Sequence, residues 1–257
     1  EMCIRDRYKR RRDMSFFSYD MLKNLKPGEF AVYNFIISHM EKIPSMNIRE
    51  LAEITGVSTT TVLRFCEKAG CEGYTEFKYR IKCRMSEPEG RNNYDSAPAL
   101  QFIKNAERDE LFQDKLGEVA DLIAQSGQVI FSGDGEGRSL AQYGIYLFNS
   151  VGKAAFRCEK ENGTVCPEKE IKSMLFILSV SGEDEEMVSL LNQYKESGAF
   201  VISITNTEQC LIAKMSDINF SCYMPETYGK NTGSVRSSQL PVIYILESLS
   251  AIISFRE

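Results

Sequence analysis

The stretch NIRELAEITGVSTTTVLRFCEKA, residues 47–69, holds two short apolar patterns of helical spacing with one glycine between them. Asn47 and Ser58 stand directly before these patterns, and both residue types cap helices by accepting hydrogen bonds from free backbone N–H groups. Gly56 can adopt the left-handed backbone conformation that a sharp turn between two helices requires. We therefore expect a helix-turn-helix unit, whose second helix would enter the major groove of DNA.

The start of the second helix carries side chains suited to a nucleic acid. Small hydroxyl groups can meet base edges and phosphates, and an arginine one turn later can hydrogen-bond guanine. The predicted DNA-contacting residues are Ser58, Thr59, Thr60, Thr61, Arg64 and Lys68. The residues of the first helix that should point inward are Ile48, Leu51, Ala52 and Ile54. The same pattern also fits a small helical bundle in which the threonines only cap a helix and the basic residues are solvated.

The rest of the chain divides by composition, and its 257 residues are enough for two cores, since single domains hold about 100 to 150 residues. Residues 1–13 have no apolar periodicity and carry a net charge of +3; we expect a non-native or disordered basic extension, with a DNA-contacting arm as the rival interpretation. Residues 14–86 form the predicted helix-turn-helix domain, which includes a helix from Gly28 to Lys42. Residues 87–98 are rich in turn formers and predict a linker, and residues 99–257 form a second domain that carries most of the negative charge.

The second domain alternates apolar runs with amphipathic segments. Strands are predicted at residues 128–132, 154–157, 174–180, 200–205 and 218–222. Helices are predicted at residues 136–151, 184–197, 209–215 and 235–253. This alternation predicts an α/β fold with a doubly wound, mostly parallel sheet, preceded by the all-α helix-turn-helix domain. Such a sheet binds ligands at the carboxyl ends of its strands.

Two strand ends carry residues suited to a ligand. FSGDGEGRS, residues 131–139, has three glycines that let backbone approach a ligand, and LSVSGED, residues 178–184, has serine hydroxyls before a helix N-terminus. The predicted ligand-binding residues are Ser132, Gly133, Gly135, Gly137, Ser139, Ser179, Ser181, Gly182 and Asp184. A plain tight turn at the first end, and ordinary helix capping by Ser181 and Asp184 at the second, are the alternatives.

These motifs resemble a known family of bacterial regulators. The order and spacing of residues 25–29, 48–52, 56–58, 61–66 and 73–78 are similar to the DNA-binding domain of the RpiR family, over about residues 22–85. Residues 128–253 resemble the sugar-isomerase-type (SIS) domain that follows it, a flavodoxin-like fold. The resemblance implies a transcription regulator that binds double-stranded DNA, senses a small sugar-like effector, phosphorylated or not, and forms a homodimer or homotetramer without a cofactor.

Two positions depart from the SIS pattern, where the phosphate loop usually reads Ser-x-Ser-Gly-x-Thr and the first strand ends in Gly-x-Gly-x-Ser. Gly137 stands where serine is usual, and Asp184 stands where threonine is usual, within the acidic run of residues 183–186. Carboxylates suit a helix start but repel a phosphate dianion. We expect a sugar-sized pocket with weakened phosphate binding, whose effector is unphosphorylated, amino-bearing or absent.

The main alternative function is that of a SIS-domain enzyme, a sugar-phosphate isomerase or an etherase, because one fold carries both uses. Isomerisation needs a base, and ring opening often uses histidine, but the only histidine is His39 in the N-terminal domain. Glu136, Glu159 and Glu226 remain as candidate bases. We expect a regulator and not an enzyme; a protein whose SIS domain only dimerises is the third interpretation.

Composition excludes further classes. The eight cysteines form no Cys-x-x-Cys pair, so we expect reduced thiols and no metal site. No apolar run reaches the roughly 20 residues that a membrane-spanning helix needs, and the start has no signal-peptide pattern. A cytoplasmic protein without a membrane partner is expected.

Overall fold

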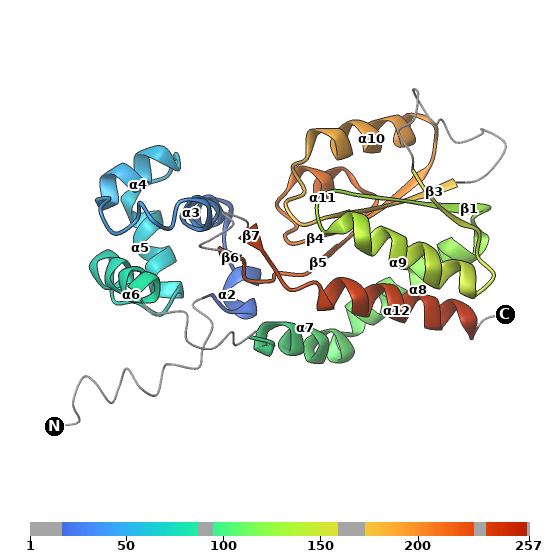
Figure 1. Cartoon of the computed structure of the whole chain (residues 1–257), viewed down its shortest axis with the longest axis horizontal. Helices are drawn as coiled ribbons and strands as arrows, with labels where there is room; N and C mark the ends of the chain where they lie inside the picture. Colours follow the sequence, from blue (N-terminus) through green and yellow to red (C-terminus); the bar gives the residue numbers. More distant parts are fainter. Residues whose placement is uncertain (1–16, 87–94, 159–172, 229–234, 256–257) are drawn as a thin grey trace. The chain divides into compact units, whose positions relative to one another are not determined.

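The computed structural model describes residues 17–86, 95–158, 173–228 and 235–255. The chain forms two compact units (Figure 1). One contains the described residues up to Leu100 together with those of Met224–Ser238, and the other contains Gln101–Tyr223 and the residues from Gln239 onward. Residues 99–257 were expected to form one domain, whereas the Met224–Ser238 segment groups with the N-terminal unit. No helix in the described ranges is long and apolar enough to span a bilayer.

The N-terminal unit is built from helices around a small apolar core. Its helices are α2 (Tyr19–Lys23), α3 (Pro27–Ser38), α4 (Ile48–Ile54), α5 (Thr59–Lys68) and α6 (Tyr74–Ser86). Phe65 of α5 and Phe77 of α6 are fully buried, and their rings meet edge to face at 5.7 Å between centroids. Helix α3 is shorter than the expected 28–42 because turns begin after His39, whose ring stacks on Phe35.

The Met224–Ser238 segment adds a short hairpin to this unit. Strands β6 (Thr227–Tyr228) and β7 (Val235–Arg236) pair antiparallel. The backbone N–H of Glu226 donates to the buried hydroxyl of Tyr33 in α3 at 3.0 Å. The predicted helix from residue 235 to residue 253 is therefore wrong at its start: helix α12 spans Leu240–Ser254, with Pro241 in its first turn, a position that proline favours.

The C-terminal unit is a parallel sheet with helices on both faces. Its strands are β1 (Gln128–Gly133), β2 (Ala155–Arg157), β3 (Ser173–Ser179), β4 (Phe200–Thr205) and β5 (Ile218–Ser221). They lie in the order β2-β1-β3-β4-β5 and all pair parallel, which confirms the expected doubly wound, flavodoxin-like fold. The helices are α7 (Ala97–Arg108, whose first residues belong to the N-terminal unit), α8 (Glu110–Gln125), α9 (Gly137–Ser150), α10 (Glu185–Glu196), α11 (Leu211–Met215) and α12.

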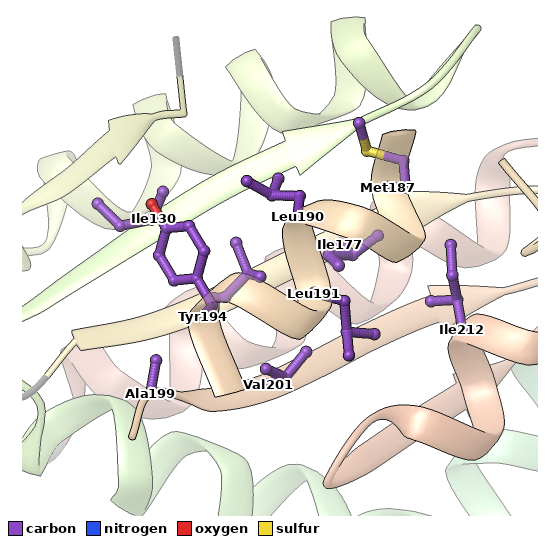
Figure 2. Packing of buried hydrophobic residues seen from close by; sticks show 10 residues of the cluster. Ile130, Ile177, Met187, Leu190, Leu191, Tyr194, Ala199, Val201 and Ile212 are labelled. Atoms are coloured by element: carbon purple, nitrogen blue, oxygen red, sulfur yellow. The ribbon is translucent and has the colours of Figure 1, made fainter. Parts of the chain in front are cut away.

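Each face of the sheet has its own apolar layer. On one face, α10 and α11 cover β3 and β4. Leu191 of α10 lies near Val201 of β4, and the ring of Tyr194 extends toward Ile130 of β1 (Figure 2). On the other face, where α8, α9 and α12 lie (Figure 1), Phe131 of β1 stacks on Phe176 of β3. Every residue of β3 is buried, as expected for a central parallel strand. This double layer holds the carboxyl ends of β1 and β3 side by side.

Candidate functional site

Helices α4 and α5 are held by the caps that the sequence predicts. The Asn47 side chain accepts hydrogen bonds from the N–H groups of Arg49 and Glu50, and the Glu50 carboxylate accepts one from the N–H of Asn47. The hydroxyl of Ser58 accepts from the N–H of Thr61 at 3.2 Å. Gly56 has φ +67°, which confirms the left-handed turn between the two helices.

Helix α5 has one buried and one exposed face. Val62, Phe65 and Cys66 are buried, which anchors the helix and leaves Thr60 and Arg64 in solvent. Thr59 and Thr61 are partly buried; the Thr61 hydroxyl lies 3.0 Å from that of Ser58, and its methyl group faces Gly28. Of the six predicted contact residues, Ser58 and Thr61 are thus engaged in capping, and Thr60 and Arg64 have side chains available to a partner.

The exposed face also contains Leu63, which sequence reasoning missed. Its side chain is 39% exposed on a helix whose other apolar residues are buried. Its place between Val62 and Arg64, three residues after Thr60, is the signal that could have identified it. An apolar side chain on such a face can contact the methyl group of thymine. Ile54 was expected to point inward, but its side chain is exposed (58%), so that prediction is wrong.

Lys68, a predicted DNA contact, has a structural partner. Its ammonium group donates to the buried carboxylate of Glu29 at 2.5 Å and to the carbonyl of Asn24 at 2.7 Å. Burial alone would raise the pKa of Glu29, but the hydrogen bonds from the Lys26 N–H and from Lys68 outweigh it, and the pKa is lowered. Lys68 therefore ties α5 to α3, and its contact with DNA stays a prediction.

The predicted ligand-binding residues lie at the carboxyl ends of β1 and β3, where the order of the strands in the sheet reverses direction. Strand β1 is flanked by β2 and β3, so the chain connections after β1 and β3 run in opposite directions. Doubly wound sheets bind ligands at such a point. Ser132 near the end of β1 is buried, and its hydroxyl points to the sulfur of Met187 at 3.4 Å. Ser139 and Ser181 are exposed at this edge. The structure thus brings the two predicted strand ends together, but buries part of the residue set.

The glycines after β1 are explained by close packing. A Cβ atom on Gly137 would lie 2.0 Å from the carbonyl oxygen of Leu178 in β3, and one on Gly133 would lie 2.7 Å from the same oxygen. No side chain fits at residue 137 without movement of the backbone. Gly135 has φ +45° and no neighbour within 4 Å of a built Cβ, which is typical of a turn. The missing serine at residue 137 therefore has a steric cause in this chain.

Asp134, which was not among the predicted site residues, links the two strand ends. Its carboxylate accepts a hydrogen bond from the Ser179 hydroxyl at 2.9 Å, and the Ser179 oxygen accepts one from the N–H of Gly182 at 3.0 Å. Burial is the main cause that raises the pKa of Asp134; the Ser179 hydrogen bond opposes it, and the charge of Asp184 adds to it. The signal in the sequence was a carboxylate between two glycines directly after a buried strand.

Two further carboxylates occupy backbone donors at the same edge. Asp184 caps α10 by accepting from the N–H of Met187 at 3.0 Å, as the capping alternative predicts. Glu183 accepts from the N–H of Leu211 at 3.0 Å. Gly182 has φ +66°, and a Cβ there would lie 2.1 Å from the sulfur of Cys210. The edge is therefore polar and carries several carboxylates, whose charge repels an anion.

The described part of the chain was searched for a possible metal site. No group of three or more His, Cys, Asp or Glu side chains there could hold a metal ion. Cys66 and Cys222 are buried free thiols, and burial raises the pKa of each to about 12, so neither is a thiolate at neutral pH.

Comparison with known proteins identifies both halves of the chain. The family described as "Helix-turn-helix domain, rpiR family" matches residues 19–88, and the SIS domain family matches residues 122–249. The chain belongs to the RpiR family. An uncharacterized HTH-type transcriptional regulator of Caldanaerobacter subterraneus is 23% identical over 248 residues, covering 90% of this chain and 88% of the relative. The HTH-type transcriptional regulator GlvR of Bacillus subtilis is 22% identical over 244 residues, covering 91% and 92%.

The fold of a solved relative agrees with this assignment. The structure described as the Vibrio vulnificus NanR protein complexed with ManNAc-6P superposes with a TM-score of 0.51 at 18% identity, covering 93% of this chain and 91% of NanR. The chain is thus an RpiR-type transcriptional regulator whose N-terminal domain binds DNA.

Proposed function

We propose that this RpiR-family regulator reads operator DNA with the exposed face of α5 and senses a small sugar-like ligand at the carboxyl ends of β1 and β3. The observation that carries the DNA-binding part is the division of α5 into two faces. Val62 and Phe65 fix the helix against its own unit, while Thr60, Leu63 and Arg64 remain open to a partner. A major groove accepts a helix that presents such a face.

Each exposed residue of α5 has a chemical role in the proposal. Arg64 donates to guanine, the most common specific contact in protein–DNA recognition, and Leu63 contacts a thymine methyl group. Thr60 meets a phosphate or a base edge near the helix N-terminus, where backbone N–H groups favour an anion. A homodimer or homotetramer would place two α5 helices on half-sites about one helical turn, or a multiple of it, apart.

The experiment for DNA binding is genomic footprinting of the purified full chain, followed by affinity measurements on the fragments found. Arg64→Ala and Thr60→Ala should each weaken specific binding, Arg64→Ala by about fivefold or more, because a good base contact contributes about 1–3 kcal/mol. Arg108→Ala, an exposed arginine in α7, is the matched control and should leave affinity nearly unchanged. Unaltered operator affinity in Arg64→Ala and Thr60→Ala would refute the proposed interface.

The ligand part of the proposal is supported by the SIS fold and by the polar edge of the sheet. NanR, which shares the fold, is described as complexed with ManNAc-6P. In this chain the exposed hydroxyls of Ser139 and Ser181 suit sugar hydroxyls, whereas Asp184 disfavours a phosphate group. A ligand that binds one domain arrangement more tightly than another would shift operator affinity. Calorimetric titration with hexose phosphates and amino sugars tests the class; tight binding of an ordinary hexose phosphate would contradict weakened phosphate binding.

An enzymatic role has less support than regulation. The relatives described above are named as regulators, and His39 lies in the N-terminal unit with its ring stacked on Phe35. Of the candidate bases, Glu136 accepts a hydrogen bond from Gln239, Glu226 belongs to the N-terminal unit, and Glu159 lies outside the described residues. Turnover of a sugar phosphate by the purified chain would favour the enzyme instead.

A further inference from the structure

We propose that the Asp134 carboxylate occupies the position of a ligand anion between the ends of β1 and β3, so that this SIS domain excludes phosphorylated ligands. A ligand that binds at the carboxyl ends of β1 and β3 must then carry an uncharged or cationic group where it contacts Ser179. The inference rests on the proposed function, because it specifies the ligand class of the same site.

The first support is the position of the two residues. The order β2-β1-β3-β4-β5 makes the boundary between β1 and β3 the point where the chain connections turn in opposite directions. Asp134 directly follows β1, and Ser179 is the last residue of β3. Their hydrogen bond therefore joins the two strand ends at the point where doubly wound sheets bind their ligands.

The second support is the use of the hydrogen-bond donors. Ser179 has one hydroxyl proton, and it is donated to Asp134; the side chain is 2% exposed and also accepts from the N–H of Gly182. The backbone N–H of Asp134 donates to the Leu178 carbonyl at 3.3 Å, which holds the carboxylate-bearing turn against β3. An incoming phosphate oxygen would have to displace Asp134 before Ser179 could donate to it.

The third support is that residue 137, the first of α9, cannot supply the donor that Ser179 has lost. Gly137 lies so close to Leu178 that a hydroxyl-bearing side chain has no room. Around the same edge, Asp184 and Glu183 accept from the N–H groups of Met187 and Leu211. A phosphate dianion would therefore meet several carboxylates, with Arg138 as an exposed cation nearby.

The test is calorimetric titration of the full chain with inorganic phosphate. We compare the natural protein with Asp134→Ala, which empties the position, and Asp134→Asn, which keeps the shape but removes the charge. Asp184→Asn is the charge-matched control, because asparagine also caps a helix and Asp184 does not contact the Ser179 hydroxyl. Asp134→Ala should bind phosphate at least about tenfold more tightly than the natural protein, and Asp184→Asn should gain clearly less.

Two results would overturn the proposal: a phosphate affinity of Asp134→Ala equal to that of the natural protein, or a gain in Asp184→Asn equal to the gain in Asp134→Ala. The last result would mean that net charge and not occupancy sets the affinity. If Asp134→Ala does not fold, as judged by circular dichroism, Asp134→Asn carries the decision. The titration contains no DNA, so its failure would leave the proposed role of α5 intact, and a failure of Arg64→Ala to weaken DNA binding would leave this inference intact.

Discussion

Glu29 shows how a single buried carboxylate can link the stability of the N-terminal unit to pH. Its side chain is almost fully buried and accepts hydrogen bonds from the Lys26 N–H and from Lys68. The pKa in the folded chain is lowered from 4.5, so in acid the unfolded chain binds more protons than the folded one. The stabilisation is fully present above the unfolded pKa and is lost as the pH falls through the lower folded pKa.

We therefore expect the free energy of unfolding to fall between about pH 5 and about pH 3, and Glu29→Gln to remove part of that fall. Urea denaturation at both pH values measures the difference. Glu41→Gln, at an exposed position, is the control and should keep the natural pH dependence. An identical acid-induced loss in Glu29→Gln and the natural protein would contradict this role of Glu29.

Gly137 is a second residue whose identity is set by its surroundings. Because Gly137 lies within α9, alanine would by helix propensity alone stabilise the chain by about 1 kcal/mol. The built Cβ, however, lies 2.0 Å from the Leu178 oxygen. Gly137→Ala should therefore lower the free energy of unfolding by about 1–3 kcal/mol. Urea denaturation tests this, with Gly73→Ala as the control in open space; a Gly137→Ala variant as stable as the natural chain would show that the turn adapts without cost.

Helix α5 illustrates how one element serves both stability and recognition. Val62 is fully buried and its neighbour Leu63 is 39% exposed. Val62→Ala should lower the free energy of unfolding by about 1–3 kcal/mol because it leaves a cavity. Leu63→Ala should change stability by less than about 0.5 kcal/mol but weaken operator binding. Denaturation and DNA-affinity measurements on both variants separate the two roles, and a large stability loss in Leu63→Ala would place that residue in the core instead.

At the level of elements, local patterns predicted most of the strands and helices. The five strands of the sheet lie within one residue of their predicted bounds, because alternating buried runs and helix caps are local signals. Two elements differ from these predictions. Residues 235–236, predicted as the start of a helix, form β7 because they pair with the more distant strand β6. Helix α3 ends at Ser38 and not at residue 42, and turns follow from His39.

For the whole molecule, the Met224–Ser238 segment adds covalent links between the two units. The chain passes from one unit to the other after Leu100, and it crosses twice more, where this segment begins and where it ends. The chain passes from the sheet unit into this segment after Tyr223, which has φ +50°, a conformation that a residue other than glycine adopts at a cost. Its N–H donates to the Asn206 carbonyl, beside the end of β4. Within the segment, the backbone N–H of Glu226 donates a hydrogen bond to the hydroxyl of Tyr33 in α3.

Tyr33→Phe removes the acceptor of that hydrogen bond and should lower the free energy of unfolding by about 0.5–1.5 kcal/mol. The amide of Glu226 should exchange its hydrogen faster, because it loses its partner. Hydrogen exchange followed by NMR or mass spectrometry measures this. Tyr74→Phe removes a hydroxyl that bonds to the Met46 carbonyl, and it should leave the exchange at Glu226 unchanged. Unaltered exchange in Tyr33→Phe would mean that this hydrogen bond does not hold the segment.

The amino-acid sequence alone was enough for the helix-turn-helix, the parallel α/β fold and the RpiR resemblance, because caps, glycine turns and apolar periodicity act between residues close in the chain. It was not enough for the Asp134–Ser179 hydrogen bond, the Lys68–Glu29 pair or the placement of residues 224–238. These contacts join segments as much as 193 residues apart. Only the packed chain decides them, because the strand order and the space left between elements determine which distant groups meet.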